Sequence, residues 1–107
     1  MGKRNSHLVV VWEFWVRSGA AAEFEKAYGA EGAWVRLFSR DPAYGGTKLV
    51  RAVGEARRYL TFDYWASAET YELFRRNHVD EYGVIDRECE GLTESEKEIG
   101  RFEGRSA

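Results

Sequence analysis

The chain has 107 residues, of which 44% are hydrophobic and 15% aromatic, and this composition excludes an intrinsically disordered chain. Its 16 basic and 18 acidic residues give a net charge of −2 without a concentrated basic face, which argues against nucleic-acid binding. The single cysteine, Cys89, excludes an intramolecular disulfide framework and a cysteine-rich zinc site. We therefore expect one domain over residues 1–107, with its core at about 7–103, in a reducing, cytoplasmic compartment.

The segment His7–Arg17 predicts a strand, because it is rich in β-branched and aromatic residues and contains no breaker. One of its faces carries Leu8, Val10, Trp12, Phe14 and Val16. The other face carries Val9, Val11, Glu13 and Trp15. Both faces are mostly apolar, so we expect a central strand that is covered on both sides. Its apolar run is far too short to span a bilayer, which takes ~20 residues, and no membrane association is expected.

Two short helices are predicted next. Apolar residues recur at helical spacing over Ala20–Tyr28, and Gly29 and Gly32 interrupt this pattern. The helical pattern resumes on a stripe formed by Trp34, Leu37 and Phe38. We expect a loop after this stripe, at Asp41–Pro42 and Gly45–Gly46.

A hairpin is predicted from two alternating segments, Thr47–Val53 and Arg58–Trp65, joined by a short turn around Gly54–Glu55. In the second segment, one face is formed by Leu60, Phe62 and Tyr64. The opposite face is formed by Tyr59, Thr61, Asp63 and Trp65.

A long helix is predicted to begin after Ser67, which is expected to be its N-cap, with Glu69 in the first turn. Its apolar stripe consists of Tyr71, Phe74, His78, Tyr82, Ile85, Cys89 and Leu92. The pattern also allows a break near Asn77–Val79, and Gly91 is expected to end the helix. The last segment, Lys97–Phe102, predicts a short strand at a sheet edge.

This βαββαβ order is that of the ferredoxin-like α+β fold, in which two helices cover one face of a four-stranded antiparallel sheet. The other face would then leave apolar residues such as Val9, Val11 and Trp15 exposed. We therefore expect a homodimer in which the two sheets face each other.

His78 is the first residue with chemistry to offer, because it falls on the apolar stripe of the long helix and an imidazole can act as a base near neutral pH. Tyr82 lies one helical turn later, within reach of a shared hydrogen bond. The structural alternative is a core histidine that is satisfied by a backbone carbonyl or by Tyr82.

Four tryptophans in so small a domain offer stacking surfaces for a flat aromatic ligand, and we predict that Trp65, Trp34 and Trp12 contact it, together with Asp63. The alternative for each of them is a role in the core or in an interface. Asp63 shares a strand face with Trp65, and Glu13 lies on the neighbouring strand. A buried carboxylate at either position is a potential proton acceptor with a raised pKa. The simpler interpretation is that both are neutralised by Arg17, Arg51 or Lys48.

The sequence predicts neither an organic cofactor nor a metal site. It contains no GxGxxG or GxxxxGK[ST] phosphate loop, no serine nucleophile elbow and no HExxH motif. Cys89 lies on the apolar stripe and is expected to be buried and inert. The arginine pairs Arg57–Arg58 and Arg75–Arg76 are interpreted as solvated ends of elements.

Two segments resemble the antibiotic biosynthesis monooxygenase domain family. The first is VWEFWVRSGAAAEFEKAY, and the second is RRYLTFDYWASAETYELFRRNH, in which a strand ends in Trp65 and a histidine, His78, closes the following helix. The resemblance implies a dimeric α/β barrel with a pocket between the sheet and the helices of each protomer. Its best-known members oxidise polycyclic phenols with molecular oxygen and without metal or flavin. Haem-degrading members have an asparagine in the first strand where this chain has Trp12, which argues against haem degradation.

The resulting hypothesis is a cofactor-independent monooxygenase-like protein acting on a small aromatic or polyketide-like molecule. His78 would accept a phenolic proton, Tyr82 would relay it, and Trp65 and Trp34 would pack against the rings. The alternative is a non-catalytic small-molecule-binding or assembly domain of the same fold, with a haem-binding relative ranked last. The small aromatic ligand and a second copy of the chain are the expected partners.

Overall fold

The computed structural model describes residues 6–105. The elements follow one another along the chain as β1 (Ser6–Val16), α1 (Ala21–Tyr28), α2 (Ala33–Phe38), β2 (Tyr44–Arg51), β3 (Arg58–Trp65), α3 (Ala68–Asn77), α4 (Val79–Cys89), a 3-10 helix (Glu90–Leu92) and β4 (Thr93–Arg105). The four strands form one antiparallel sheet in the order β2-β3-β1-β4. This is the ferredoxin-like arrangement, and the predicted fold class is confirmed.

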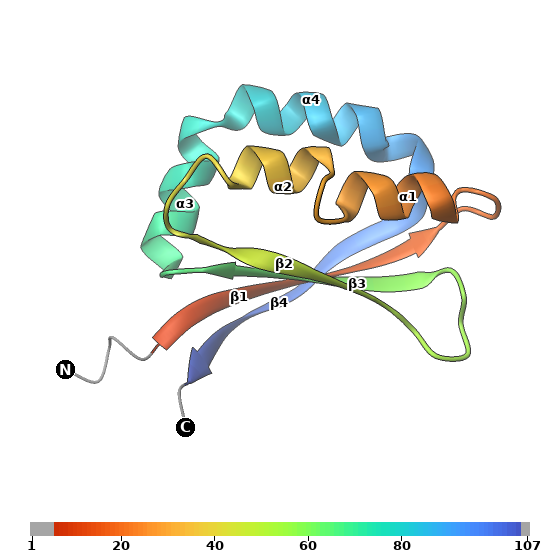
Figure 1. Cartoon of the computed structure of the whole chain (residues 1–107), viewed down its shortest axis with the longest axis horizontal. Coiled ribbons are helices and arrows are strands. Elements are labelled where there is room, and N and C mark those ends of the chain that lie inside the picture. Colours follow the sequence, from red (N-terminus) through yellow and green to blue (C-terminus); the bar gives the residue numbers. More distant parts are fainter. Residues whose placement is uncertain (1–5, 106–107) are drawn as a thin grey trace.

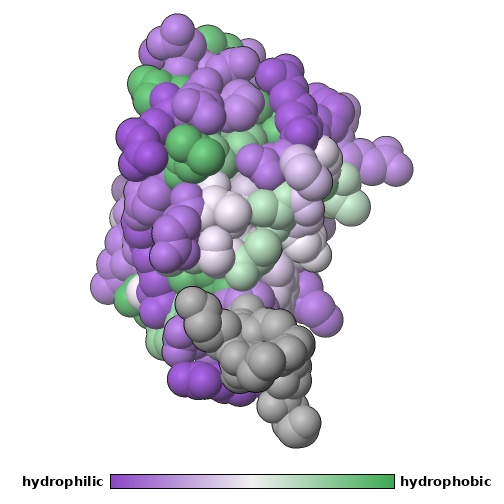
Figure 2. All heavy atoms as spheres, turned by 90° about the vertical axis from the view of Figure 1, so that its left-hand side faces the viewer, coloured by the Kyte–Doolittle hydropathy of each residue, from purple (hydrophilic) through white to green (hydrophobic). Residues whose placement is uncertain are grey.

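All the helices lie over one face of the sheet (Figure 1). Within residues 6–105 no helix or strand covers the opposite face, so the expectation that the first strand is covered on both sides is met on one side alone. At the end of the molecule where α3 lies, Figure 2 shows hydrophilic residues with a few hydrophobic ones among them, rather than one continuous hydrophobic patch. No helix of the described residues is long and apolar enough to cross a membrane.

The core lies between the sheet and the helices and is mainly aromatic. β1 is central, as predicted, because it pairs with β3 on one side and with β4 on the other. Its helix-facing residues Val10 and Val16 have no exposed surface. The largest fully buried side chains are Trp65, Tyr59, Tyr71, Phe24 and Phe74. Burying each aromatic ring removes a large apolar surface from water, which is how so short a chain holds together.

β3 alternates strictly between buried and half-buried residues. Tyr59, Thr61, Asp63 and Trp65 are buried under the helices, and the intervening residues face the uncovered side. The period of two in the sequence therefore assigned both faces of this strand correctly.

The two outer strands differ from the expected ones. β2 begins at Tyr44 rather than at Thr47, and it ends at Arg51 rather than at Val53. Gly45 and Gly46, expected in a loop, belong to β2, where the pairing register shifts between Tyr44 and Gly46. Gly46 has φ +109°, a conformation that side chains rarely adopt, so a glycine permits the strand to continue through this shift. β4 runs over thirteen residues and not merely over Lys97–Phe102, because main-chain bonds to β1 hold a segment that has little apolar alternation.

The expected long helix is divided at His78, as the sequence allowed. Ser67 caps α3 through a capping box, because its side chain accepts from the Thr70 amide and the Thr70 hydroxyl bonds the Ser67 amide. His78 has φ −128° and ψ 31°, outside the helical range, and α4 begins at the next residue. α4 ends at Cys89, shortly before Gly91, and Cys89 is buried as predicted.

Candidate functional site

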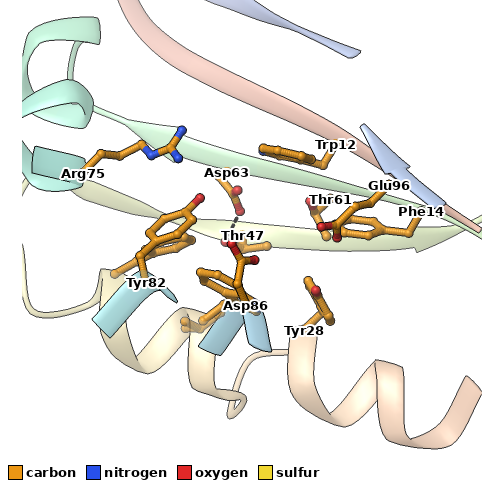
Figure 3. A pocket seen from close by; sticks show the side chains of 13 residues that line it. Trp12, Phe14, Tyr28, Thr47, Thr61, Asp63, Arg75, Tyr82, Asp86 and Glu96 are labelled. Atoms are coloured by element: carbon orange, nitrogen blue, oxygen red, sulfur yellow. Dashed lines mark hydrogen bonds between the residues drawn. The ribbon is translucent and has the colours of Figure 1, made fainter. Parts of the chain in front are cut away.

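A cavity of about 110 Å³ lies between the sheet and the helices, where the sequence resemblance placed a pocket (Figure 3). Its wall is largely aromatic, and it also contains an arginine, three carboxyl groups and two threonines. The lining residues are Trp12, Phe14, Tyr28, Trp34, Val35, Phe38, Thr47, Thr61, Asp63, Arg75, Tyr82, Asp86 and Glu96. Asp86 and Glu96 are exposed, so the cavity opens to solvent beside them.

Asp63 is the buried carboxyl of this cavity, with 8% of its surface exposed. It projects from the buried face of β3 and accepts a hydrogen bond of 2.6 Å from the Thr47 hydroxyl of β2, the strand residue paired with it. Burial raises the pKa of Asp63 from 3.8 to about 6, and the bond from Thr47 opposes part of this rise. A carboxylate with a pKa near 6 can both accept and release a proton close to neutral pH.

The expectation that Arg17, Arg51 or Lys48 neutralises the strand carboxylates is wrong. Among residues 6–105, no Lys, Arg or His nitrogen lies within 4.0 Å of the Asp63 carboxylate. Glu13 instead pairs with Arg58, at 2.7 Å, on the uncovered side of the sheet. The two carboxyls therefore lie on opposite faces of the sheet, and of the two only Asp63 lines the cavity.

Arg75 and Tyr82 form the wall of the cavity beside Asp63. The guanidinium carbon of Arg75, on α3, lies 4.6 Å from the ring centroid of Tyr82 and 5.8 Å from that of Tyr71. In Figure 3, Arg75, Tyr82 and Asp63 point toward one space between the sheet and the helices. The interpretation of Arg75 as a solvated helix end is thus wrong, because it is half-buried in this wall, whereas its neighbour Arg76 is exposed.

Burial also raises the pKa of the Tyr82 hydroxyl well above its ordinary range. The phenol therefore stays protonated at neutral pH and can donate or accept a hydrogen bond without carrying charge. At the mouth, burial is the main cause that raises the pKa of Asp86 and of Glu96, and the charge of Asp86 adds to the rise at Glu96. Two carboxyl groups thus line the mouth, while the cation of the cavity lies at Arg75.

His78 is not among the residues that line the cavity. Its Nδ1 lies 3.0 Å from the carbonyl oxygen of Phe74, and its ring stacks on the Phe74 ring with centroids 4.2 Å apart. The backbone contact is the one foreseen for a structural histidine. Tyr82 does line the cavity, and its backbone amide, rather than its hydroxyl, bonds to His78, at the carbonyl oxygen. The structure thus separates the two side chains that the sequence grouped together.

The predicted ligand-binding tryptophans fall into two groups. Trp12 and Trp34 line the cavity. The rings of Trp34 and Tyr82 pack edge to face, with their centroids 4.7 Å apart. Trp65 does not line the cavity. Its side chain is 1% exposed and its ring packs within 5.6 Å, centroid to centroid, of four other rings, those of Phe38, Tyr44, Tyr71 and Phe74. Trp65 therefore packs behind the cavity wall, against the lining residue Phe38.

Several lining residues were not identified from the sequence as site residues. They are Phe14, Tyr28, Val35, Phe38, Thr47, Thr61, Arg75, Asp86 and Glu96. A signal existed for Arg75, which follows Tyr71 by one helical turn and so borders the apolar stripe. A signal also existed for Thr61, on the same strand face as Asp63. Thr47, Asp86 and Glu96 required the packing of separate elements to be known.

No protein-family model matches the chain, and no curated protein matches its sequence. Solved structures do match it. SnoaB, a cofactor-independent oxygenase from Streptomyces nogalater, superposes with a TM-score of 0.72 over 95% of this chain and 96% of its own, at 20% identity. A proposed antibiotic biosynthesis monooxygenase from Caulobacter crescentus CB15 superposes with a TM-score of 0.71 over 97% of this chain and 92% of its own, at 16% identity. Another, from Bordetella bronchiseptica, gives 0.67 over 95% and 98%, at 14% identity.

These matches show that the chain has the fold of the antibiotic biosynthesis monooxygenases over nearly its whole length. The resemblance identified in the sequence is confirmed at the level of the fold. Because one fold hosts many reactions, the activity has to be argued from the cavity itself.

Proposed function

We propose that this protein is a cofactor-independent monooxygenase-like enzyme that acts on a small aromatic or polyketide-like molecule. The observation that carries the proposal is Asp63, a buried carboxyl with a pKa near 6 at the wall of an aromatic cavity, with no cation within 4.0 Å among the described residues. A reaction that begins with loss of a phenolic proton requires such a base next to an apolar site that receives the ring.

The reaction that fits is oxidation of a phenol to a quinone by molecular oxygen. Asp63 takes the phenolic proton, and the O–H electron pair stays on the substrate as a phenolate. The electron-rich ring then reduces O₂ and a carbon–oxygen bond forms at the ring. Loss of the ring proton and cleavage of the O–O bond release water, so that phenol and O₂ give quinone and water. The substrate supplies all four electrons, and protonated Asp63 returns its proton to the departing oxygen.

The rest of the cavity supports this chemistry. Trp12, Trp34 and Phe38 provide flat apolar surfaces that fix the plane of a ring and exclude water around it. The neutral hydroxyl of Tyr82 faces the same space as Asp63 and can donate a hydrogen bond to the substrate oxygen as negative charge develops on it (Figure 3).

In this scheme Asp63 replaces His78 as the proton acceptor. The His78 ring is outside the lining and its Nδ1 is engaged by the Phe74 carbonyl, so a ligand in the cavity would meet Asp63 first. His78 then has a structural role at the break between α3 and α4. Its ring stacks on Phe74, which in turn packs against Trp65.

We further propose that the protein works as a homodimer formed through the uncovered face of the sheet. Val9, Val11 and Phe62 lie side by side on this face, because Val9 pairs with Phe102 and Val11 with Phe62 across the strands. Phe102 is 52% exposed on the same face. An apolar sheet surface of this kind is covered in stable proteins, and a second copy supplies an identical apolar surface.

The test is oxygen uptake by the purified protein with a panel of hydroxylated aromatics, without added metal or flavin. We expect substrate-dependent uptake that Asp63→Asn reduces at least 100-fold, because the amide cannot accept the proton. Asp80→Asn, at an exposed carboxyl outside the cavity, is the matched control and should retain the wild-type rate. Ligand binding that quenches tryptophan fluorescence without any oxygen uptake would overturn the proposal and favour the non-catalytic binding domain.

A further inference from the structure

We propose that Arg75 is the anchor for an acidic substituent of the ligand, and that the cavity selects a single-ring hydroxyaromatic acid over the uncharged ring. This inference rests on the proposed function, because it takes the binding of a small aromatic molecule as given. It adds the charge and the size of that molecule.

The first support is the state of the Arg75 side chain. Its guanidinium lies 4.6 Å from the centre of the Tyr82 ring, and within residues 6–105 no carboxylate oxygen comes within 4.0 Å of it. Arg101 also lies against Tyr71, with its guanidinium carbon 5.2 Å from the ring centroid. Unlike Arg75, it forms salt bridges with Glu72 and Glu98. Arg75 is thus half-buried in the wall without a carboxylate partner among the described residues, and its planar guanidinium can receive a carboxylate in two-point geometry.

The second support is the distribution of charge in the cavity. Asp86 and Glu96 are the exposed carboxyls of the lining, whereas Arg75 points into the same space as Asp63 and Tyr82 (Figure 3). A ligand carboxylate is repelled at the mouth and attracted at Arg75, so a ligand that carries one enters in a single orientation. A hydroxyl on the same ring then donates to the Asp63 carboxylate, which accepts from Thr47 alone among the described residues. The cavity therefore offers one partner for an acid and another for a phenol.

The third support is size. A cavity of ~150 Å³ in a protein interior holds benzene. This cavity is smaller, at about 110 Å³, but it is open on one side, so it accommodates no more than one ring, with substituents that extend toward the opening. The polycyclic alternative would have to extend through the mouth, between the two carboxyls.

The experiment measures binding in the absence of oxygen, so that turnover is not needed. The probes are 3-hydroxybenzoate and 4-hydroxybenzoate, each compared with its neutral hydroxybenzamide, by calorimetry or by tryptophan fluorescence at pH 7.5. We expect at least one acid to bind at least tenfold more tightly than its amide. Arg75→Gln should remove this preference, Arg75→Lys should retain part of it, and Arg76→Gln, at the exposed neighbour, should leave it unchanged.

Equal affinity of acid and amide in the wild type would overturn the inference without any variant. Retention of the full preference in a folded Arg75→Gln protein would also overturn it. The two proposals fail separately: a preference for the acids without oxygen uptake supports Arg75 and contradicts the oxygenase, whereas uptake with neutral phenols and no preference does the reverse.

Discussion

The Thr47 hydroxyl donates a 2.6 Å hydrogen bond to the buried carboxylate of Asp63, from the strand residue directly opposite it. The Tyr44 hydroxyl is bonded to the same Thr47 oxygen, so a short chain of hydroxyls leads along the sheet to the carboxylate. Asp63 is therefore oriented by β2 while its other acceptor sites face the cavity. This one bond keeps a carboxylate usable as a base in surroundings that would otherwise favour its protonated form.

The pH dependence of turnover should report Asp63. Burial raises its pKa to about 6, and the base is active when ionised, so oxygen uptake at saturating substrate should be low at pH 5, rise through about pH 6 and level off above pH 7. The measurement is a pH–rate profile with a substrate whose own ionisation lies well above this range. A profile that stays flat from pH 5 to pH 8 would exclude Asp63 as the proton acceptor.

Asp63→Asn should stabilise the protein at alkaline pH. The folded-state pKa of Asp63 is above its unfolded value of 3.8, so the folded protein binds the proton more tightly and loses stability as pH rises from about 4 to above 6. The loss amounts to about 3 kcal/mol once the carboxyl is fully ionised in both states. Urea unfolding at pH 4 and pH 8 measures it. From pH 4 to pH 8, the unfolding free energy of the variant should rise relative to that of the wild type. An equal difference in unfolding free energy at both pH values would contradict the raised pKa of Asp63 in the folded protein.

Thr47→Val should move the activity profile to higher pH. The bond from Thr47 lowers the pKa of Asp63 against the effect of burial, so its removal raises that pKa above 6 and shifts the rising limb of the pH–rate profile upward. Thr47→Ser retains the hydroxyl and should keep the wild-type midpoint. An identical midpoint in the valine and serine variants would mean that the bond does not tune the base.

On β3 the alternation of residue types along the sequence matches the alternation of buried and half-buried side chains. The sequence therefore predicted both faces of this strand, with Asp63 and Trp65 on the same one. On β4 there is no such match. β4 is an edge strand and is rich in charged residues. Its length is determined by main-chain pairing with β1, so its sequence shows little alternation of apolar and polar residues. The two ends of this strand were therefore missed.

Positions on α3 and α4 were only partly predictable. The stripe through Tyr71, Phe74 and Tyr82 was correct, but the helix break at His78 takes that residue out of the regular spacing that had placed it toward the sheet. Arg75 was assigned to solvent from its charge, yet stacking on Tyr82 keeps it in the cavity wall. No pattern along one segment indicates that a helical arginine and a strand aspartate will line the same cavity, since this depends on how the layers pack.

His78→Ala should affect stability more than chemistry. The substitution removes a bond to the Phe74 carbonyl and a ring stacked on Phe74, and it should cost about 1–2 kcal/mol of unfolding free energy. Oxygen uptake per folded molecule should stay within about threefold of the wild-type rate, since the side chain is outside the cavity lining. Chemical unfolding and uptake measured on the same preparation separate the two effects. A stable variant that has lost turnover would reinstate His78 as the proton acceptor.

Phe102→Glu should dissociate the proposed dimer. Phe102 is 52% exposed on the uncovered sheet face, opposite Val9 and over Gly100, where an added Cβ would meet its ring at 3.1 Å. A carboxylate in the middle of a dry sheet-to-sheet contact costs several kcal/mol, so the dimer dissociation constant should rise at least ~100-fold. Sedimentation velocity across a concentration series measures this.

Leu73→Glu is the matched control for that change. Leu73 is 50% exposed on α3, on the helical side of the molecule, so it undergoes the same apolar-to-acidic substitution at nearly the same exposure but away from the sheet face. It should leave the dissociation constant unchanged. If both variants dissociate to the same degree, the interface includes the helical side, and if neither does, the uncovered sheet face is not where two copies meet. In the expected case the cavity of each protomer stays intact, because its lining comes from the opposite face of the sheet and from the helices, and the Phe102→Glu monomer should still bind the aromatic probes.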